Sequence, residues 1–447
     1  VSISGDYVVV SSPFEDTTAT DSGSVYIFKR SGTTWSQQQQ IQASDAADSD
    51  FLGAGIGQGG GGIAIDNDYF IIGAVNNDDD GANSGSAYIF KRTGTTWAQQ
   101  AKIVASDAAA SDQFGTVVDI SGDYAIAGAP NEDTGGSNAG SVYIFKKVDI
   151  FTSYTVRITR NGDTSSTGTG NFDITPSDGN VTLRNWGNSP SSGNLGAALW
   201  DNASGTSLRV YDDGTIILAG ETLTTYTVGG SPATFYECGS GLGGTNFHVA
   251  ITIVSRTTGP GWSQQQKIQA SDPQADDAFG GGVSLSGDYL AVGARTEDTG
   301  GSQAGSVYIF KKASGSETWS QEAKLQASDV SAASQFGMSV SLSGNTLAVG
   351  ANAEDTAASD AGAAYIFERS GTTWTEVKKI TASDTQASDY FGESISTDGT
   401  TTFVGAWGED TKGSNAGAAY VYEKVYAGPT LTYDNANKLS LTGVTTP

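Results

Sequence analysis

The amino-acid sequence predicts an all-β protein, a six-bladed β-propeller of four-stranded antiparallel blades with a β-sandwich-like domain inserted into it. Three observations lead to this fold class. A Tyr-Ile-Phe string, or a close variant of it, recurs six times along 447 residues, the composition is rich in turn formers with 60 Gly against 9 Pro, and one interval between repeats is too long by about one domain. A ring of seven blades stays open as an alternative.

Four signatures recur in the same order. A Gly-Ser-Val-Tyr-Ile-Phe-Lys string, or a close variant, has its tyrosine at Tyr26, Tyr88, Tyr143, Tyr308, Tyr365 and Tyr420. A Trp-x-Gln-like segment follows at Trp35, Trp97, Trp262, Trp319 and Trp374. An Ala-Ser-Asp signature then ends at Asp45, Asp107, Asp272, Asp329 and Asp384, and the next unit opens at Phe51, Phe114, Phe279, Phe336 and Phe391. Such an ordered series predicts tandem copies of one structural unit.

Each unit reads as four short strands, as the fourth repeat illustrates. Val283 and Leu285 alternate with polar residues, which is typical of a half-buried strand, and Gly287 with Asp288 supplies a tight turn. Residues 289–294, 307–310 and 319–325 are the other three strands. One such sheet cannot bury both of its faces alone, so the copies must stack. Radial stacking is favoured, and a solenoid is the alternative.

The repeats resemble the FG-GAP repeats of integrin α-subunit propellers and of their bacterial and viral relatives. The resemblance lies in Phe-Gly pairs at 114–115, 279–280, 336–337 and 391–392, and in Gly-Ala pairs at 128–129, 293–294, 350–351 and 405–406. It implies a propeller, which in this family usually has seven blades. The family's Asp-x-Asp-x-Asp-Gly calcium loop is shortened here to Ser-Gly-Asp, which has too few oxygens to surround a calcium ion. The calcium site of the family is therefore not expected at that hairpin.

Two segments stand outside the repeats. The interval from Phe114 to Phe279 is 165 residues, whereas the two that follow it are 57 and 55, so an extra domain interrupts the third repeat. The predicted organisation is a propeller over 1–147 and 259–425, an inserted all-β domain over 148–258, and a tail over 426–447. The tail reads as a β-hairpin, similar to short β units of phage fibres, and it could instead supply the outer strand that the sixth repeat lacks.

Charge and composition exclude several function classes. The net charge of −26 repels phosphate backbones and anionic lipid, so neither nucleic-acid binding nor membrane insertion is expected. Cys238 and His248 are the only residues of their types, which excludes an intrachain disulfide and removes the support for a nucleophilic triad or a zinc site.

Acidic clusters recur in register between the second and third strands of the repeats. Their aspartates are Asp16, Asp78, Asp133, Asp298, Asp355 and Asp410. Turn capping is the favoured interpretation, because Asp oxygens accept hydrogen bonds from nearby backbone N–H groups. Divalent-cation binding, with calcium as the candidate, is the alternative. Catalysis by paired carboxylates is disfavoured, since nearly every repeat carries the same pair and an active site is asymmetric.

The sequence therefore predicts a non-enzymatic surface protein. The propeller would be an extracellular scaffold for adhesion or ligand recognition, and the inserted domain its partner-binding face. Candidate partner-binding residues are the aromatic side chains Trp186, Trp200, Tyr211 and Tyr236. The expected partner is a protein or glycan on a cell surface, or a neighbouring subunit of an extracellular assembly. The alternative is a structural component of a virion surface or extracellular filament.

Overall fold

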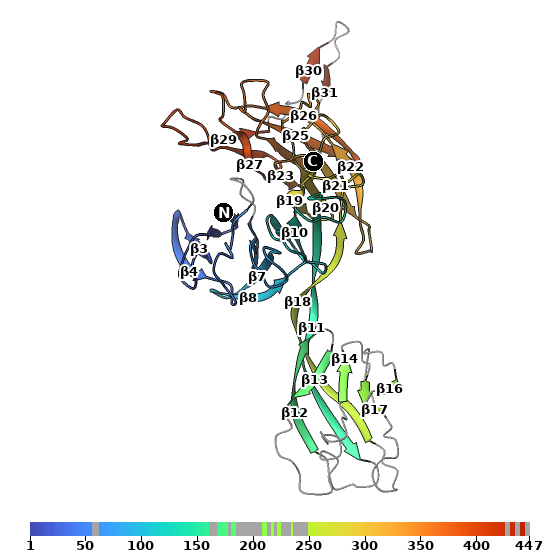
Figure 1. The fold of residues 1–447 in the computed structure, drawn as a ribbon. Helices are drawn as coiled ribbons and strands as arrows, with labels where there is room; N and C mark the ends of the chain where they lie inside the picture. Colours follow the sequence, from blue (N-terminus) through green and yellow to red (C-terminus); the bar gives the residue numbers. More distant parts are fainter. Residues whose placement is uncertain are drawn as a thin grey trace. The chain divides into compact units, whose positions relative to one another are not determined.

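The computed structural model describes residues 1–55, 62–148 and 261–424 with their side chains, and further strands in the insertion and the tail as backbone. Among these residues the chain forms strands β1 to β31 and no helix. The chain divides into two compact units, residues 1–147 with 262–447, and residues 148–261. The predicted all-β, six-bladed propeller is confirmed (Figure 1).

The first three blades are four-stranded antiparallel sheets. Blade 1 consists of β1 (Ser2–Ser4), β2 (Tyr7–Ser12), β3 (Ser24–Ser31) and β4 (Thr34–Ile41). Blade 2 consists of β5 (Ile63–Asp66), β6 (Tyr69–Ala74), β7 (Ser86–Thr93) and β8 (Thr96–Ile103). Blade 3 consists of β9 (Val118–Ser121), β10 (Tyr124–Ala129), and the blade portions of β11 (Ser141–Arg160) and β18 (Val249–Ile268).

The last three blades continue the series. Blade 4 consists of β19 (Phe279–Ser286), β20 (Tyr289–Ala294), β21 (Ser306–Lys312) and β22 (Trp319–Leu325). Blade 5 consists of β23 (Ser339–Ser343), β24 (Thr346–Ala351), β25 (Ala363–Ser370) and β26 (Thr373–Ile380). Blade 6 consists of β27 (Phe391–Thr397), β28 (Thr401–Ala406) and β29 (Ala418–Glu423), and has no fourth strand among the described residues.

The insertion leaves blade 3 along β11 and returns along β18. Between them lie β12 (Gly168–Ser177), β13 (Asn180–Arg184), β14 (Leu208–Tyr211), β15 (Ile216–Leu218), β16 (Glu221–Thr224) and β17 (Thr234–Phe235). Strands β11 to β16 pair in chain order, each antiparallel to the next, and β17 pairs with β18. The predicted packing of these strands as a sandwich depends on side chains that lie outside the described residues.

The predicted tail hairpin is present as β30 (Thr430–Tyr433) and β31 (Leu439–Thr442). These two strands pair with each other in a separate sheet, and β29 is the last strand of the sheet of blade 6. The tail therefore does not supply the outer strand of blade 6 in this structure. In the portion of the chain that the structure describes, no helix has the length and apolar character needed to cross a membrane.

Glycine brings the backbones of adjacent blades into direct contact. Gly337 of the Phe-Gly pair has a φ of +92° and lies against Gly293 of the preceding blade, where an added Cβ would meet the Gly337 carbonyl oxygen at 2.0 Å. The N–H of Gly337 donates to the carbonyl of Gly350 at 3.0 Å, which fastens the Phe-Gly loop to its own blade. The Phe-Gly and Gly-Ala signatures recur because any side chain at these positions would push the blades apart.

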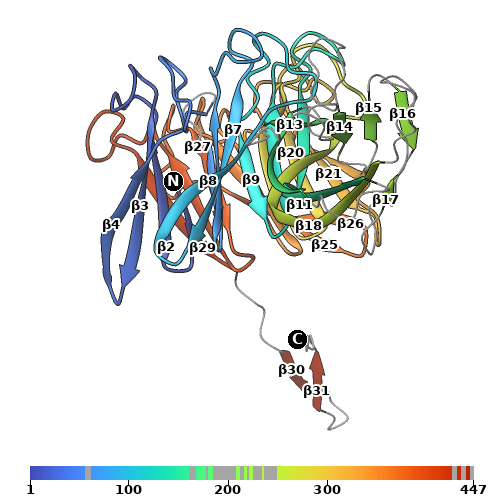
Figure 2. The same cartoon turned by 90° about the horizontal axis from the view of Figure 1, so that it is seen from below.

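Polar side chains join the inner strands of neighbouring blades. Asp119 Oδ2 accepts the Leu285 N–H at 2.7 Å, and Ser284 and Ser341 make the equivalent contact with the next blade at 3.0 and 2.9 Å. The long loops between second and third strands lie at one end of the blades, and the tight turns between third and fourth strands lie at the other (Figure 2). The loop end therefore collects equivalent residues from successive blades.

Candidate functional site

The six aspartates predicted as turn caps or metal ligands each close a loop at the loop end. In every case Oδ1 accepts the backbone N–H of the residue five positions later. The distances are 2.8 Å for Asp16, 2.6 Å for Asp78, 2.8 Å for Asp133, 2.7 Å for Asp298, 2.7 Å for Asp355 and 2.5 Å for Asp410. Six loops therefore repeat one capping contact.

Calcium binding by these aspartates stays a prediction. Calcium takes six to eight oxygen ligands, which must converge on one point. Across the described ranges, no group of three or more Asp, Glu, His or Cys side chains is arranged to hold a metal ion. Each capping aspartate serves its own loop, so the geometry at these positions accounts for the recurrent acidic residues without a cation.

In blades 3 to 6 the residue that precedes the capping aspartate is a buried glutamate, which has a different role. Glu132 in blade 3 accepts the Thr134 N–H at 3.0 Å and the Ser141 hydroxyl at 2.7 Å. Burial acts to raise the pKa of this carboxyl, but the hydrogen bonds from Thr134, Ser141 and Lys267 outweigh burial and hold the pKa below its usual value. Glu297 in blade 4 has the same surroundings and the same direction of shift. These glutamates are charged structural groups at neutral pH.

A lysine completes this group in the middle blades, and sequence reasoning missed it. In blade 4, Lys324 Nζ lies 2.7 Å from Asp272 Oδ2 and 3.0 Å from Glu297 Oε1, and 5.2 Å from the centre of the Tyr308 ring. The Tyr308 hydroxyl donates to Asp272 at 2.8 Å. Asp272 belongs to the connector that enters the blade, so the lysine joins three separate segments. We refer to these four residues and their equivalents as the lysine cluster.

Blades 3 and 5 repeat the lysine cluster of blade 4, and blade 2 has a variant of it with Asn77 in place of the glutamate. The lysines lie five residues after the tryptophan of the outer strand and are Lys102, Lys267, Lys324 and Lys379. Lys267 pairs with Asp107 and Glu132 at 2.7 and 2.9 Å, and Lys379 pairs with Asp329 and Glu354 at 2.6 and 3.1 Å. In blade 2, Lys102 contacts Asp45 at 2.8 Å and also Asp79. The Trp-x4-Lys spacing in the sequence was the signal that could have revealed these contacts.

The tryptophan of the same strand packs onto the preceding blade. The Trp319 and Tyr124 rings meet edge to face with their centres 5.9 Å apart, and Trp374 meets Tyr289 at 6.4 Å. Trp97 meets Tyr7 in the same manner at 5.7 Å. The outer strand therefore holds its blade at two points, with the tryptophan near the tight turns and the lysine at the loop end.

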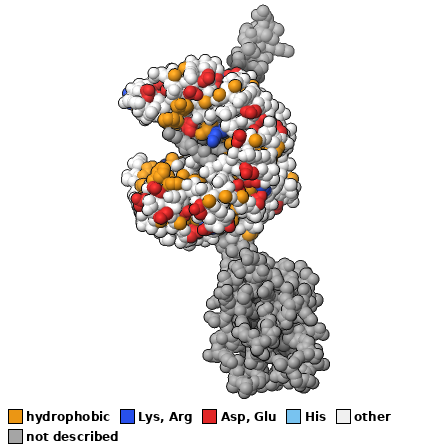
Figure 3. All heavy atoms as spheres, in the orientation of Figure 1, with side chains coloured by type: hydrophobic (Ala, Val, Ile, Leu, Met, Phe, Trp, Pro, Cys, Tyr) orange, Lys and Arg blue, Asp and Glu red, His pale blue; other side chains and the backbone are white. Residues whose placement is uncertain are grey.

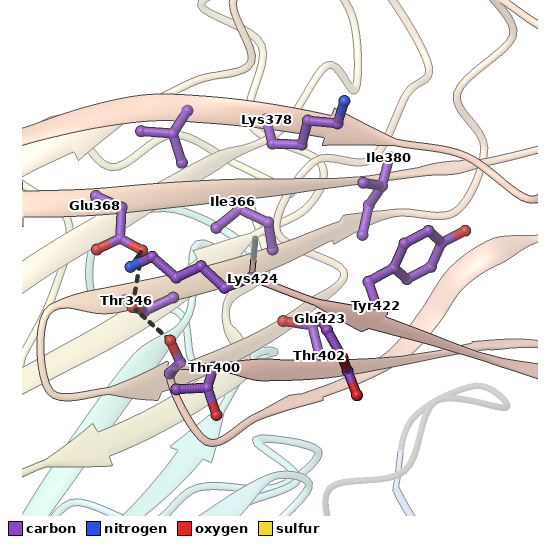
Figure 4. A pocket seen from close by; sticks show the side chains of 12 residues that line it. Thr346, Ile366, Glu368, Lys378, Ile380, Thr400, Thr402, Tyr422, Glu423 and Lys424 are labelled. Atoms are coloured by element: carbon purple, nitrogen blue, oxygen red, sulfur yellow. Dashed lines mark hydrogen bonds and ion pairs between the residues drawn. The ribbon is translucent and has the colours of Figure 1, made fainter. Parts of the chain in front are cut away.

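No outer strand of blade 6 is found among the described residues, and a groove of about 470 Å³ lies between blades 5 and 6. Ile366, Ile380 and Tyr422 line its apolar part (Figure 4). Thr346 of blade 5 occupies the position of Tyr124 in blade 3 and Tyr289 in blade 4, each of which contacts a tryptophan of the next blade. The Thr346 hydroxyl donates to Glu368 at 2.9 Å. Lys424 pairs with the same carboxylate at 2.6 Å.

The outward face of blade 6 is also exposed. Val421 and Phe403 are 56% and 50% exposed, whereas Ile309, which corresponds to Val421 in blade 4, is fully buried against the next blade. On blade 1, Trp35 is 38% exposed, compared with 2% for Trp319. Figure 3 shows an opening between the first and last blades with hydrophobic side chains on both sides of it. Among the described residues, the series of blade-to-blade interfaces is therefore interrupted at this position.

The predicted partner-binding aromatics cannot be placed in this site. Trp186, Trp200 and Tyr236 lie outside the described residues, and the side chain of Tyr211 lies outside them as well. Their assignment stays a prediction. The groove between blades 5 and 6 and the lysine cluster are the described features that the sequence did not single out.

Comparisons with known proteins bear on the family. No curated protein matches the chain. Among solved structures, a putative 6-phosphogluconolactonase from Bacteroides uniformis is 12% identical, with coverage of 98% of this chain and 96% of that chain and a TM-score of 0.37. Sqt1 of Saccharomyces cerevisiae is 9% identical, with coverage of 90% of each chain and a TM-score of 0.26. Likenesses at this level say nothing about function.

A model of the FG-GAP repeat matches six stretches that together make up more than half of the chain. The stretches are residues 1–28, 35–90, 97–145, 262–310, 319–367 and 374–422. Each full match begins at the outer strand of one blade and ends in the third strand of the next, so the motif crosses an interface between blades. Because this model matches more than half of the chain and the structure has six blades, the chain belongs to the FG-GAP repeat family.

Proposed function

We propose that this protein is a non-enzymatic extracellular scaffold for adhesion or ligand recognition, in which the inserted residues 148–258 carry the partner-binding face. The partner is a protein or glycan on a cell surface, or a neighbouring subunit of an extracellular assembly. FG-GAP repeats are typical of extracellular proteins, which supports this location.

The observation that supports this proposal is that blade 3 keeps its usual contacts on both sides of the insertion. Before the insertion, β11 pairs with β10 from Ser141 to Lys146. After it, Trp262 meets Tyr69 edge to face at 6.1 Å, and Lys267 completes the lysine cluster. Blade 4, which has no insertion, makes the same contacts. The added domain is therefore not needed for the blade, and retaining it favours a separate role.

The described blades themselves offer few distinctive groups for recognition. The recurrent aspartates cap loops, the buried glutamates and lysines tie connectors to blades, and the aromatic rings fill the interfaces. Because these contacts are equivalent in blades 3, 4 and 5, a partner would find little to distinguish one of these blades from another. A single inserted domain with its own aromatic residues provides the asymmetry that specific recognition requires.

A deletion tests the proposal. Joining Lys147 to Gly261 by a short Gly/Ser turn removes the insertion, and a matched control replaces residues 313–317 between β21 and β22 with the same turn. Both variants should unfold cooperatively in thermal melts. In a glycan array and in cell-surface binding of labelled protein, the full chain and the control should bind and the deletion variant should not. A folded deletion variant that binds as well as the full chain would assign recognition to the blades.

A further inference from the structure

We propose that Lys102 and Asn77 of blade 2 form an intramolecular isopeptide bond, an amide that joins the lysine Nζ to the side-chain Cγ of the asparagine and releases ammonia. The bond is a covalent modification of the chain by its own residues. Asp45, next to the lysine, serves as the base, and Asp50, next to the asparagine, serves as the acid. This proposal is independent of the insertion and of its partner.

Blade 2 differs from blades 3, 4 and 5 at the position where the lysine cluster has a buried glutamate. Asn77 takes that position in blade 2 and is 2% exposed. A carboxylate is a poor acceptor for a nucleophile because it is negatively charged, whereas a carboxamide is neutral and can lose its nitrogen as ammonia. Among the lysine clusters of the described blades, that of blade 2 is the one in which the lysine contacts a carboxamide.

The two reacting groups are in contact in the structure. Lys102 Nζ lies 3.1 Å from Asn77 Oδ1 and 5.4 Å from the centre of the Tyr88 ring. Because a C=O bond is about 1.2 Å long, Nζ is at most about 4.3 Å from the Cγ atom that it must attack. Reacting atoms start from about 3–3.5 Å, so a small rotation of the lysine side chain completes the approach. The fold of the blade therefore holds the nucleophile close to its acceptor.

Two further side chains activate the amide of Asn77. The Ser86 hydroxyl donates to Asn77 Oδ1 at 2.7 Å, so it stabilises the negative charge that develops on this oxygen during attack. Asn77 Nδ2, the leaving nitrogen, donates to Asp50 Oδ1 at 3.4 Å. Asp50 is 4% exposed, and burial, as the largest influence, raises the pKa of its carboxyl. A protonated Asp50 is thus within reach of the nitrogen that must accept a proton in order to leave.

The lysine must lose a proton before it attacks, and a base lies beside it. Lys102 Nζ is 2.8 Å from Asp45 Oδ2 and also contacts Asp79. Burial acts to lower the pKa of Lys102, but its bonds to Asp45 and Asp79 outweigh burial and raise the pKa. The neutral amine is therefore scarce, so the bond should form slowly at neutral pH and faster at pH 9.

The atoms of the step balance without an external reagent. Asp45 takes one proton from Lys102, and the neutral Nζ then forms a bond to Cγ of Asn77. Nδ2 takes the proton of Asp50, and the Cγ–Nδ2 bond breaks. Nζ returns a proton to Asp50, while the released ammonia takes the proton from Asp45 and leaves as ammonium. One amide replaces another, and both aspartates regain their starting states.

Mass spectrometry of the 447-residue protein tests the proposal. After incubation at pH 9, the intact mass should be about 17 Da below the mass of the sequence, which is the loss of one ammonia. A tryptic digest should contain two peptides joined through Asn77 and Lys102, with no cleavage after Lys102, because trypsin does not cut after a lysine whose Nζ is acylated.

Variants of the protein identify the source of the mass difference. Lys102→Arg keeps the positive charge but removes the nucleophile, so this variant should have the full mass of its sequence. It also distinguishes the isopeptide bond from a succinimide at Asn77, which loses ammonia without any lysine. Lys324→Arg in blade 4 is the matched control and should still lose about 17 Da. Asp50→Asn should form the bond about a hundredfold more slowly, and thermal melts check that each variant is folded.

Three results would each overturn the proposal. The first is a natural protein that keeps the full mass of its sequence after incubation at pH 9. The second is a loss of ammonia that persists in Lys102→Arg. The third is a digest in which Asn77 is joined to another lysine or to none.

Discussion

Blades 5 and 6 have the same three inner strands but differ in what lies beyond the third. In blade 5, β26 places Trp374 on the preceding blade and Lys379 between two carboxylates, and Tyr365 is buried. In blade 6, where the described part of the chain forms no such strand, Tyr420 and Tyr422 are only half-buried and a groove lies beside them. The comparison shows that the outer strand is the element that closes a blade against its neighbour and against the connector that enters it.

The strongest test of this comparison is the buried tryptophan. Trp319→Ala should lower the free energy of unfolding by about 3–5 kcal/mol, because it removes a large ring that is 2% exposed from the interface between blades 3 and 4. Trp35→Ala, at the equivalent position of blade 1, should cost less than about 1 kcal/mol, because that ring is 38% exposed. Chemical denaturation of the two variants measures both, and equal losses would contradict the comparison.

The next largest effect should be a dependence of stability on pH, which comes from Asp277 in the connector before blade 4. Burial, as the largest influence, raises the pKa of Asp277 to about 6, although its carboxylate accepts the Gln274 N–H at 2.8 Å. A carboxyl whose folded pKa is raised stabilises the fold below its unfolded pKa near 4, and that contribution is lost as the pH rises through 6. The protein should lose about 2–3 kcal/mol between pH 4 and pH 8 from this group.

Asp277→Asn tests that assignment. Asparagine keeps a carbonyl acceptor for the Gln274 N–H but carries no charge at any pH. The variant should therefore lose less stability than the natural protein between pH 4 and pH 8, as measured by denaturation at a series of pH values. A difference between the two proteins that does not depend on pH would show that Asp277 does not titrate in this range.

The lysine cluster should show a comparable effect at neutral pH. Lys324→Gln leaves the fully buried carboxylate of Glu297 without its cation and should cost about 2 kcal/mol. Burial acts to lower the pKa of Lys324, but its bonds to Asp272 and Glu297 outweigh burial and raise the pKa. Gln40→Lys in blade 1 is the reverse change at the equivalent position. Because the Glu15 carboxylate beside it is only half-buried, whereas Glu297 is fully buried, this variant should gain little stability. A gain equal to the loss in blade 4 would contradict this expectation.

The exposed face of blade 6 should tolerate polar residues. Val421→Ser should change the free energy of unfolding by no more than about 0.5 kcal/mol, since the side chain is 56% exposed. Ile309→Ser at the equivalent buried position of blade 4 should cost several times more, because it places a hydroxyl in an apolar interface. If the two substitutions were equally costly in denaturation, the face of blade 6 would be covered in solution.

Calcium should have the smallest effect. The six capping aspartates each serve one loop and do not converge, so the melting temperature should be the same in chelator and in millimolar calcium. Asp298→Asn is the control, since it changes a carboxylate that caps a loop and should lower stability by about 0.5–2 kcal/mol under both conditions. If calcium raised the melting temperature of the natural protein but not of this variant, that result would show that Asp298 binds calcium.

Most of the fold could be predicted because its signals are local and repeated. Alternating strands, Gly-Asp turns and the recurrent Phe-Gly pairs are readable one repeat at a time, and six copies reinforce each assignment. The acidic residues were found in the same way, and capping, the favoured interpretation, agrees with the contact of Asp298 to the Gln303 N–H. The lysines were missed, because Lys324 has partners 52 and 27 residues away, which no local pattern brings together.

The amino-acid sequence alone determined the strands, the six repeats and the position of the insertion, because each of these depends on spacing along the chain. Only the tertiary structure decided which residues meet across the blades. The strand that contains Tyr308-Ile309-Phe310 is buried in blade 4, where another strand and another blade cover it. The equivalent strand of blade 6, with Tyr420-Val421-Tyr422, is half-open. The burial of a side chain, the charge of a carboxyl and the presence of a groove depend on residues that are distant in the sequence. Those residues come together only when the chain folds.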